Sequence, residues 1–91
     1  MSYKEEILEE VSISELLGDT NEIILFNDDH NTFEHVIKTL ITVCKHTSEQ
    51  AEQCSLIVHY KGKCGVKTGS MSELEPIYGK LLDAGLSVEI Q

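Results

Sequence analysis

Short apolar stretches separated by polar turns divide most of the 91-residue chain into regular elements. Residues 22–27 (EIILFN) form an apolar run bounded by turn-forming residues, which predicts a strand. Two further strands are expected at residues 63–68 (KCGVKT) and at residues 86–90, where LSVEI alternates apolar and polar positions. Gly65 marks either a weak point of the middle strand or a place where another part of the chain approaches closely.

Two helices are expected between the first two strands. Asn31 can cap the first helix, with Glu34 three residues later to complete a capping box. Thr47 repeats this start signal for the second helix, which should end near Gly62. Helical spacing then predicts two buried faces. The first comprises Phe33, Val36, Ile37, Leu40, Ile41 and Cys44, and the second comprises Ala51, Cys54, Ser55 and Val58.

A third helix is expected to begin at Ser70 or Ser72 and to end before Gly85, because glycine is favoured just past a helix end. Pro76 fits best in a first turn, which favours the later start or a kink. The resulting order is strand, helix, helix, strand, helix, strand. It predicts an α+β single domain of two layers, in which the helices pack on one face of a three-stranded, mostly antiparallel sheet.

Charge and composition narrow the function. The net charge of −9 argues against a nucleic-acid partner, which needs a basic face. Residues 1–22 hold seven acids and one lysine, so residues 1–21 are interpreted as an acidic extension, flexible or partly helical, before a domain at residues 22–91. The sequence has neither an apolar run of about 18 residues nor a secretory-type start, which predicts a cytoplasmic chain without a membrane partner. We expect a monomer.

The three cysteines, Cys44, Cys54 and Cys64, are an odd number and contain no C-x-x-C motif. This pattern argues against a disulfide framework or a zinc site, and we expect buried or half-buried thiols in a reducing compartment. The histidines show no metal-ligand spacing, and the chain has no phosphate loop or cofactor fingerprint. The sequence therefore predicts neither a metal nor another cofactor.

The turn Asn27-Asp28-Asp29 places two adjacent carboxylates between the first strand and the first helix. One interpretation is local, because such side chains commonly bond to their own backbone and cap the next helix. The other is a receptor for a cation, since Asn31 is available as the cap and a helix N-terminus favours ionised acids. A free α-amino group is such a cation, and its three N–H donors would meet acceptors on Asn27 and Asp28. Apolar side chains nearby would then receive the first side chain of a peptide.

The motifs LFNDDHNTFEHV, VHYKGK and CGV resemble those of ClpS, the adaptor family of the ATP-dependent Clp proteases, over roughly residues 22–90. This resemblance implies the fold shared by ClpS and the C-terminal domain of the ribosomal stalk protein. It also implies an adaptor without chemistry of its own. Such an adaptor binds the N-terminal residue of a substrate (an N-degron), usually a large hydrophobic one, and delivers it to a hexameric AAA+ unfoldase of the ClpA or ClpC type. The acidic extension would be the segment that the unfoldase engages.

The same resemblance implies roles for individual residues. Asn27 and Asp28 would hold the α-amino group, and His59 would complete that site directly or through water. Asp29 would lie at the rim and fix the turn. The side-chain pocket would be lined by Asn31, Phe33, Val36, Ser55, Val58 and Leu86. Contacts with the unfoldase are expected at His30, Ser70 and Glu75.

The chain departs from the family at Phe33 and Ser55, two positions often filled by methionine. The pocket wall at Phe33 becomes larger and the wall at Ser55 becomes smaller. Phenylalanine also cannot adapt its shape as methionine does. We therefore expect a reshaped pocket with a changed residue preference. An alternative within the family is a regulator that binds the unfoldase but has altered or lost recognition of N-terminal residues, with Phe33 filling its own pocket.

Two alternatives lie outside this family. The stalk-protein domain has the same fold class, but residues 38–67 lack its Gly- and Lys-rich motif. An enzyme could use Asp28 and Asp29 as acid and base, yet adjacent side chains need not converge on one reacting atom. The sequence also lacks a nucleophile–base pair at a recognisable spacing. We therefore expect no catalytic activity.

Overall fold

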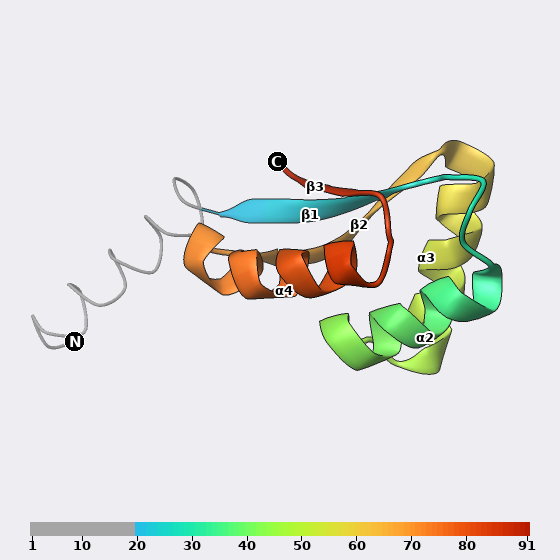
Figure 1. Cartoon of the computed structure of the whole chain (residues 1–91), viewed down its shortest axis with the longest axis horizontal. Helices are drawn as coiled ribbons and strands as arrows, with labels where there is room; N and C mark the ends of the chain where they lie inside the picture. The colour runs from blue at the N-terminus through green and yellow to red at the C-terminus, as the bar shows by residue number, and fades with distance from the viewer. Residues whose placement is uncertain (1–19) are drawn as a thin grey trace, which may run out of the picture.

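Residues 20–91 of the computed structural model form a three-stranded sheet with three helices on one of its faces (Figure 1). The predicted order of elements and the α+β class are confirmed. The expected acidic extension falls almost wholly on residues 1–19, which lie outside the described residues. The elements are β1 (Asn21–Phe26), α2 (Phe33–Cys44), α3 (Ser48–Lys61), β2 (Lys63–Gly69), α4 (Met71–Asp83) and β3 (Val88–Ile90).

The central strand β1 organises the sheet, whose order is β2-β1-β3 with both pairings antiparallel. Its residues Ile23 and Leu25 are almost fully buried in the core that the helices cover. Ile24 points to the opposite side because side chains alternate along a strand, and it is also buried. A strand buried on both sides explains why residues 22–27 show an apolar run rather than a clean alternation.

A β-bulge interrupts the pairing of β1 with β2. The register shifts between Ile23 and Ile24, so that Val66 is an extra residue on β2. At the neighbouring Gly65, an added Cβ would clash with the carboxylate of Glu22, which lies directly over this position. The expectation that another part of the chain approaches Gly65 closely is therefore confirmed.

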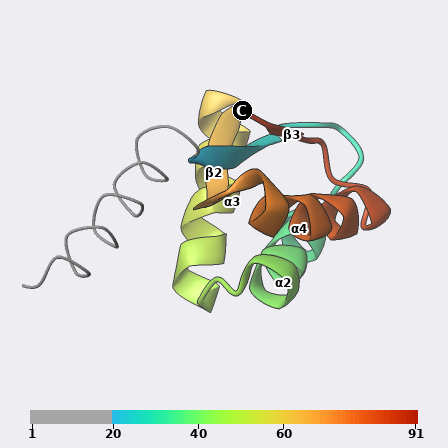
Figure 2. The same cartoon turned by 90° about the vertical axis from the view of Figure 1, so that its left-hand side faces the viewer.

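The three helices bury apolar faces against the sheet and one another. Figure 2 shows the arrangement of these helices from a second side. The buried face of α3 is the predicted one. In α2 only Leu40 and Cys44 of the predicted face are buried. Val36, Ile37 and Ile41 are partly buried, and Phe33 at the start of the helix is 44% exposed. The largest side chains that are almost fully buried are Ile23, Leu25, Leu40, Leu74 and Leu81.

The start of α2 differs from the prediction. Its N-cap is Thr32 and not Asn31, because the Thr32 hydroxyl accepts a hydrogen bond from the backbone N–H of His35 at 3.1 Å. The predicted capping box between Asn31 and Glu34 is therefore wrong. The amide of Asn31 donates instead to Asp28 in the preceding turn and to the distant Gly85. At α3 the predicted capping box of Thr47 and Gln50 is present in both directions.

The earlier of the two predicted starts of α4 is correct. Ser70 caps the helix, and its hydroxyl accepts from the backbone N–H of Glu73 while the Glu73 carboxylate accepts from the Ser70 N–H. Pro76 consequently lies inside the helix, at an exposed position. Gly85 follows the helix with a φ of 84°, as expected for a helix end. The last strand begins at Val88 and is two residues shorter than predicted.

Two adjacent leucines of α4 test how much the core contributes to stability. Leu81 is fully buried, whereas Leu82 is 47% exposed. We expect Leu81→Ala to lower the free energy of unfolding by about 2–5 kcal/mol, because it removes buried contacts and leaves a cavity. The matched variant Leu82→Ala should lower it by less than about 1 kcal/mol. Urea unfolding followed by circular dichroism measures both, and equal losses would contradict the observed packing of α4.

Candidate functional site

A cavity of about 230 Å³ lies at the carboxyl end of β1, where the turn before α2 meets α3 and the segment after α4. Pockets for drug-sized ligands measure roughly 300–1,000 Å³, so this cavity suits a single side chain. It is lined by Leu25, Phe26, Asn27, Asp28, Asp29, Asn31, Thr32, Phe33, Val36, Ser55, Val58, His59 and Leu86.

The carboxylate of Asp28 holds the turn together by accepting four hydrogen bonds. Its Oδ1 accepts from the backbone N–H groups of His30 and Asn31 at 3.0 and 2.9 Å. Its Oδ2 accepts from the Asn31 side-chain amide at 2.8 Å and from the Ser87 hydroxyl at 3.0 Å. The local interpretation of the turn is therefore correct for Asp28. This residue, rather than Asp29 as predicted, fixes the turn.

These contacts keep Asp28 ionised. Partial burial of the carboxyl group acts to raise its pKa, but the bonds from Asn31, His30 and Ser87 outweigh burial and lower the pKa from 3.8 to about 2. The cavity therefore carries a fixed negative charge at its rim at any pH above about 4.

Asn31 and His35 join the start of α2 to the end of α4. The Asn31 amide donates to the carbonyl oxygen of Gly85 at 2.9 Å as well as to Asp28. The Nε2 atom of His35 lies 2.8 Å from the carbonyl oxygen of Ala84. Because a carbonyl oxygen can only accept, this Nε2 atom carries the proton. The two contacts set the position of the segment that brings Leu86 to the cavity.

Asn27 and Asp29 present free acceptors at the rim. The backbone N–H of Asn27 donates to the carbonyl oxygen of Gly62 at 2.9 Å, which ties the turn to the end of α3. Both side chains are exposed, and neither makes a hydrogen bond to any of residues 20–91. The Asn27 carbonyl group and the Asp29 carboxylate are therefore available to a ligand, whereas the acceptor positions of Asp28 are already occupied.

The face of α3 that closes the cavity consists of Ser55, Val58 and His59, which share one side of the helix by their spacing. Ser55 and Val58 are buried, at 3% and 6% exposure. The Ser55 hydroxyl donates to the Ala51 carbonyl oxygen at 2.8 Å, so its proton is used within the helix. Ser55 therefore contributes a small wall that presents only its oxygen lone pairs to the cavity.

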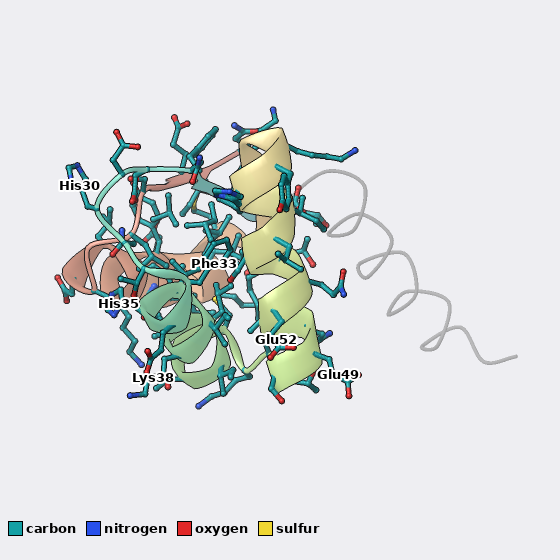
Figure 3. All side chains as sticks on the ribbon, turned by 90° about the vertical axis from the view of Figure 1, so that its right-hand side faces the viewer. His30, Phe33, His35, Lys38, Glu49 and Glu52 are labelled. Atoms are coloured by element: carbon teal, nitrogen blue, oxygen red, sulfur yellow. The ribbon has the colours of Figure 1, made fainter. Side chains whose placement is uncertain are left out.

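Phe33 and His59 face each other across the mouth. Their ring centroids are 5.1 Å apart with the planes tilted by 59°, a common arrangement for aromatic pairs. Phe33 lies between α2 and α3 in Figure 3, whereas His30 points outward from the loop. Phe33 lines the cavity and is itself partly exposed, and the space beside it remains open. Its side chain therefore forms part of the cavity wall and does not fill the cavity.

The structure brings together every residue predicted for the amino-group site, the rim and the side-chain pocket. Sequence reasoning did not find Leu25, Phe26 and Thr32, which also line the cavity. The sequence could have indicated them by position alone, because Leu25 and Phe26 come just before the turn and Thr32 comes just after Asn31. The three residues predicted to contact the unfoldase lie on two parts of the domain. His30 follows the end of β1. Ser70 caps α4, the helix that contains Glu75, and lies near the start of β1, where Asn21 pairs with Gly69.

Fold and site together define a small two-layer α+β domain with a small cavity at the end of its central strand. The family described as "ATP-dependent Clp protease adaptor protein ClpS" matches residues 18–89. The chain therefore belongs to the ClpS family.

Relatives agree with this assignment. The ATP-dependent Clp protease adapter protein ClpS of Thermosynechococcus vestitus is 37% identical over 67 residues, which are 72% of this chain and 71% of that protein. The protein of the same name from Nitratidesulfovibrio vulgaris is 42% identical over 53 residues. That match spans 56% of this chain and about half of the relative, 53%.

A solved structure shares the fold. Agrobacterium tumefaciens ClpS2 bound to L-phenylalaninamide superposes with a TM-score of 0.76, covering 80% of this chain and 95% of the other. The identity is 19%, so the likeness concerns the fold. Within the described part of this chain, no helix has the length and apolar character needed to cross a membrane.

The hydrogen bonds to Asp28 predict how stability depends on pH. Because the pKa of Asp28 is lower in the folded than in the unfolded chain, its contribution is present above about pH 4 and is lost as pH falls towards about 2. We expect Asp28→Asn to lower the free energy of unfolding at neutral pH, and the difference from the native protein to shrink over this interval. Urea unfolding at several pH values measures it. Asp29→Asn removes a neighbouring charge without such bonds, so an equal effect there would assign the change to net charge.

Proposed function

We propose that this chain is an adaptor that binds the free α-amino group and bulky hydrophobic side chain of a substrate's N-terminal residue and delivers the substrate to a Clp unfoldase. One observation carries the proposal: a single small cavity joins apolar walls to a rim of amide and carboxylate acceptors. The relatives, which are Clp protease adapter proteins, support the adaptor role. L-phenylalaninamide, named with the structural neighbour, is a small molecule with a free α-amino group and one aromatic side chain.

In the proposed amino-group site, the work is divided among three residues. Asn27 accepts a direct hydrogen bond from the ammonium group, since its side chain is free of bonds to residues 20–91. Asp28 supplies the negative charge, and its lowered pKa keeps that charge in place. His59 completes the site from α3, directly or through water. A charge-assisted hydrogen bond contributes about 1.5–3 kcal/mol.

In the proposed side-chain pocket, the first side chain of the substrate lies between α2 and α3. Val36, Val58 and Leu86 supply apolar contact, and full burial of a large apolar side chain contributes about 1.5–3 kcal/mol. Ser55 leaves room at the inner wall, while Phe33 narrows the mouth. These two residues would set which N-terminal residue is preferred.

Delivery involves surfaces outside the cavity. As proposed, the acidic extension at residues 1–21 engages the hexameric unfoldase, of the ClpA or ClpC type, and His30, Ser70 and Glu75 add contacts on the domain at residues 22–91. The protein would act as a monomer in the cytoplasm, without a cofactor and without catalysing a reaction. The alternative function is regulation of the unfoldase without N-terminal recognition.

Binding of short labelled peptides tests the amino-group site. We expect peptides that begin with one bulky class among Leu, Phe, Tyr, Trp and Ile to bind, and N-acetylation to abolish binding because the cation is removed. Asn27→Ala should weaken binding about tenfold or more, the loss of one charge-assisted bond. Gln53→Ala removes an amide outside the cavity and should leave affinity unchanged. If no free N-terminus binds in fluorescence anisotropy, the regulatory alternative replaces the proposal.

A substitution at the mouth tests the side-chain pocket. Phe33→Ala should enlarge the entrance, so peptides that begin with β-branched Ile or Val gain affinity relative to those that begin with Leu. Leu56→Ala is the matched control, because Leu56 is also 44% exposed but lies outside the cavity. The ratio of dissociation constants for the two peptide classes measures the effect. A ratio that stays the same in Phe33→Ala would mean that Phe33 is not a wall of the pocket.

A further inference from the structure

A second cleft, of about 510 Å³, lies between α3 and β2 and shares no lining residue with the peptide cavity. Two of the three cysteines line it, Cys54 from α3 and Cys64 from β2. The third, Cys44, is buried in the core and does not reach the cleft. The odd number of cysteines therefore divides into a pair and a single core thiol.

The two thiols of the pair are in direct contact. Their Sγ atoms are 2.8 Å apart, and both cysteines are free. A disulfide bond is about 2.05 Å long, so the sulfur atoms would need to approach by only roughly 0.8 Å. The tight turn at Gly62 joins α3 directly to β2 and keeps the two elements packed together.

Accessibility differs between the two sulfurs. Cys54 is 4% exposed, whereas Cys64 is half-buried. Four other charged or titratable side chains line the cleft, namely Glu22, His46, Glu49 and Lys67. Cys64 is therefore the thiol that a reagent from solvent meets first, with Cys54 behind it as the second thiol.

We propose that Cys54 and Cys64 form a redox modification site that closes a reversible intrachain disulfide by exchange with a small disulfide such as oxidised glutathione. The Cys64 thiolate attacks one sulfur of the oxidant, forms a mixed disulfide and releases one glutathione thiolate. The Cys54 thiol then attacks the Cys64 sulfur of the mixed disulfide, the second glutathione leaves, and the Cys54 proton passes to the departing glutathione thiolate. Two protein thiols are oxidised and one glutathione disulfide is reduced to two thiols.

Such a disulfide would constrain a segment that also forms part of the wall of the first cavity, the one proposed to bind peptides. The segment that it closes, residues 54–64, contains Ser55, Val58 and His59. It also contains Gly62, whose carbonyl oxygen receives the backbone N–H of Asn27. The inference itself does not rest on the proposed function, because it concerns the two thiols alone.

Intact-mass and peptide analysis of the full chain test this proposal. The protein is equilibrated with oxidised glutathione, alkylated under denaturing conditions and digested with trypsin. Each cysteine lies in a different tryptic peptide, namely residues 39–45, 46–61 and 64–67. We expect the last two to appear as one linked pair, only Cys44 to be alkylated, and added reductant to reverse the link.

Variants separate the possible outcomes. Cys44→Ala should retain the linked pair. Cys64→Ser, at a half-buried position where folding should be unaffected, should abolish the link, as should Cys54→Ala. A stable glutathione adduct on Cys64 without closure, a link that includes Cys44, or three alkylated cysteines after oxidation would each overturn the proposal.

Discussion

The ionised carboxylate of Asp28 is the interaction on which the candidate site depends. It gathers donors from its own turn, from Asn31 before α2 and from Ser87 after α4. A partly buried carboxylate is stable only when its acceptor positions are occupied, and here the donors come from segments up to 59 residues apart in sequence. Without this carboxylate, the turn, the start of α2 and the segment that carries Leu86 would lose their common partner.

This arrangement separates the rim of the cavity from its walls. Polar acceptors lie on the turn, where Asp28 and the bond from Asn27 to Gly62 fix the backbone. Apolar walls come from side chains on α2 and α3, such as Val36 and Val58, which take no part in those bonds. Residues such as Phe33 and Ser55 can therefore differ between related proteins without disturbing the rim. A substitution that changes the side-chain preference therefore disturbs fewer hydrogen bonds than one that removes the acceptor group.

Much of the fold could be predicted from local sequence patterns. The cap of α2 could not, because the Asn31 side chain also contacts a residue that is distant in sequence. Helical spacing identified the buried face of α3, and the Thr47 capping box depends on residues three apart, so both were visible in sequence. Asn31 and Thr32 are both good N-caps. In the structure the Thr32 hydroxyl caps α2, and the Asn31 amide donates instead to Asp28 and to Gly85, which is 54 residues away. That residues of the turn, α2, α3 and the segment after α4 line one cavity could likewise be inferred only through the resemblance to a known family.

Helix α3 lies between the two hollow regions of the domain. Cys54 and Ser55 are adjacent in sequence and both buried, yet they line different cavities, because successive residues on a helix point about 100° apart. The helix packs against α2 as well as β2. A disulfide at Cys54 would therefore act on the same helix that carries Ser55, Val58 and His59 of the pocket wall. The thiol pair and the pocket wall are mechanically connected through this one element.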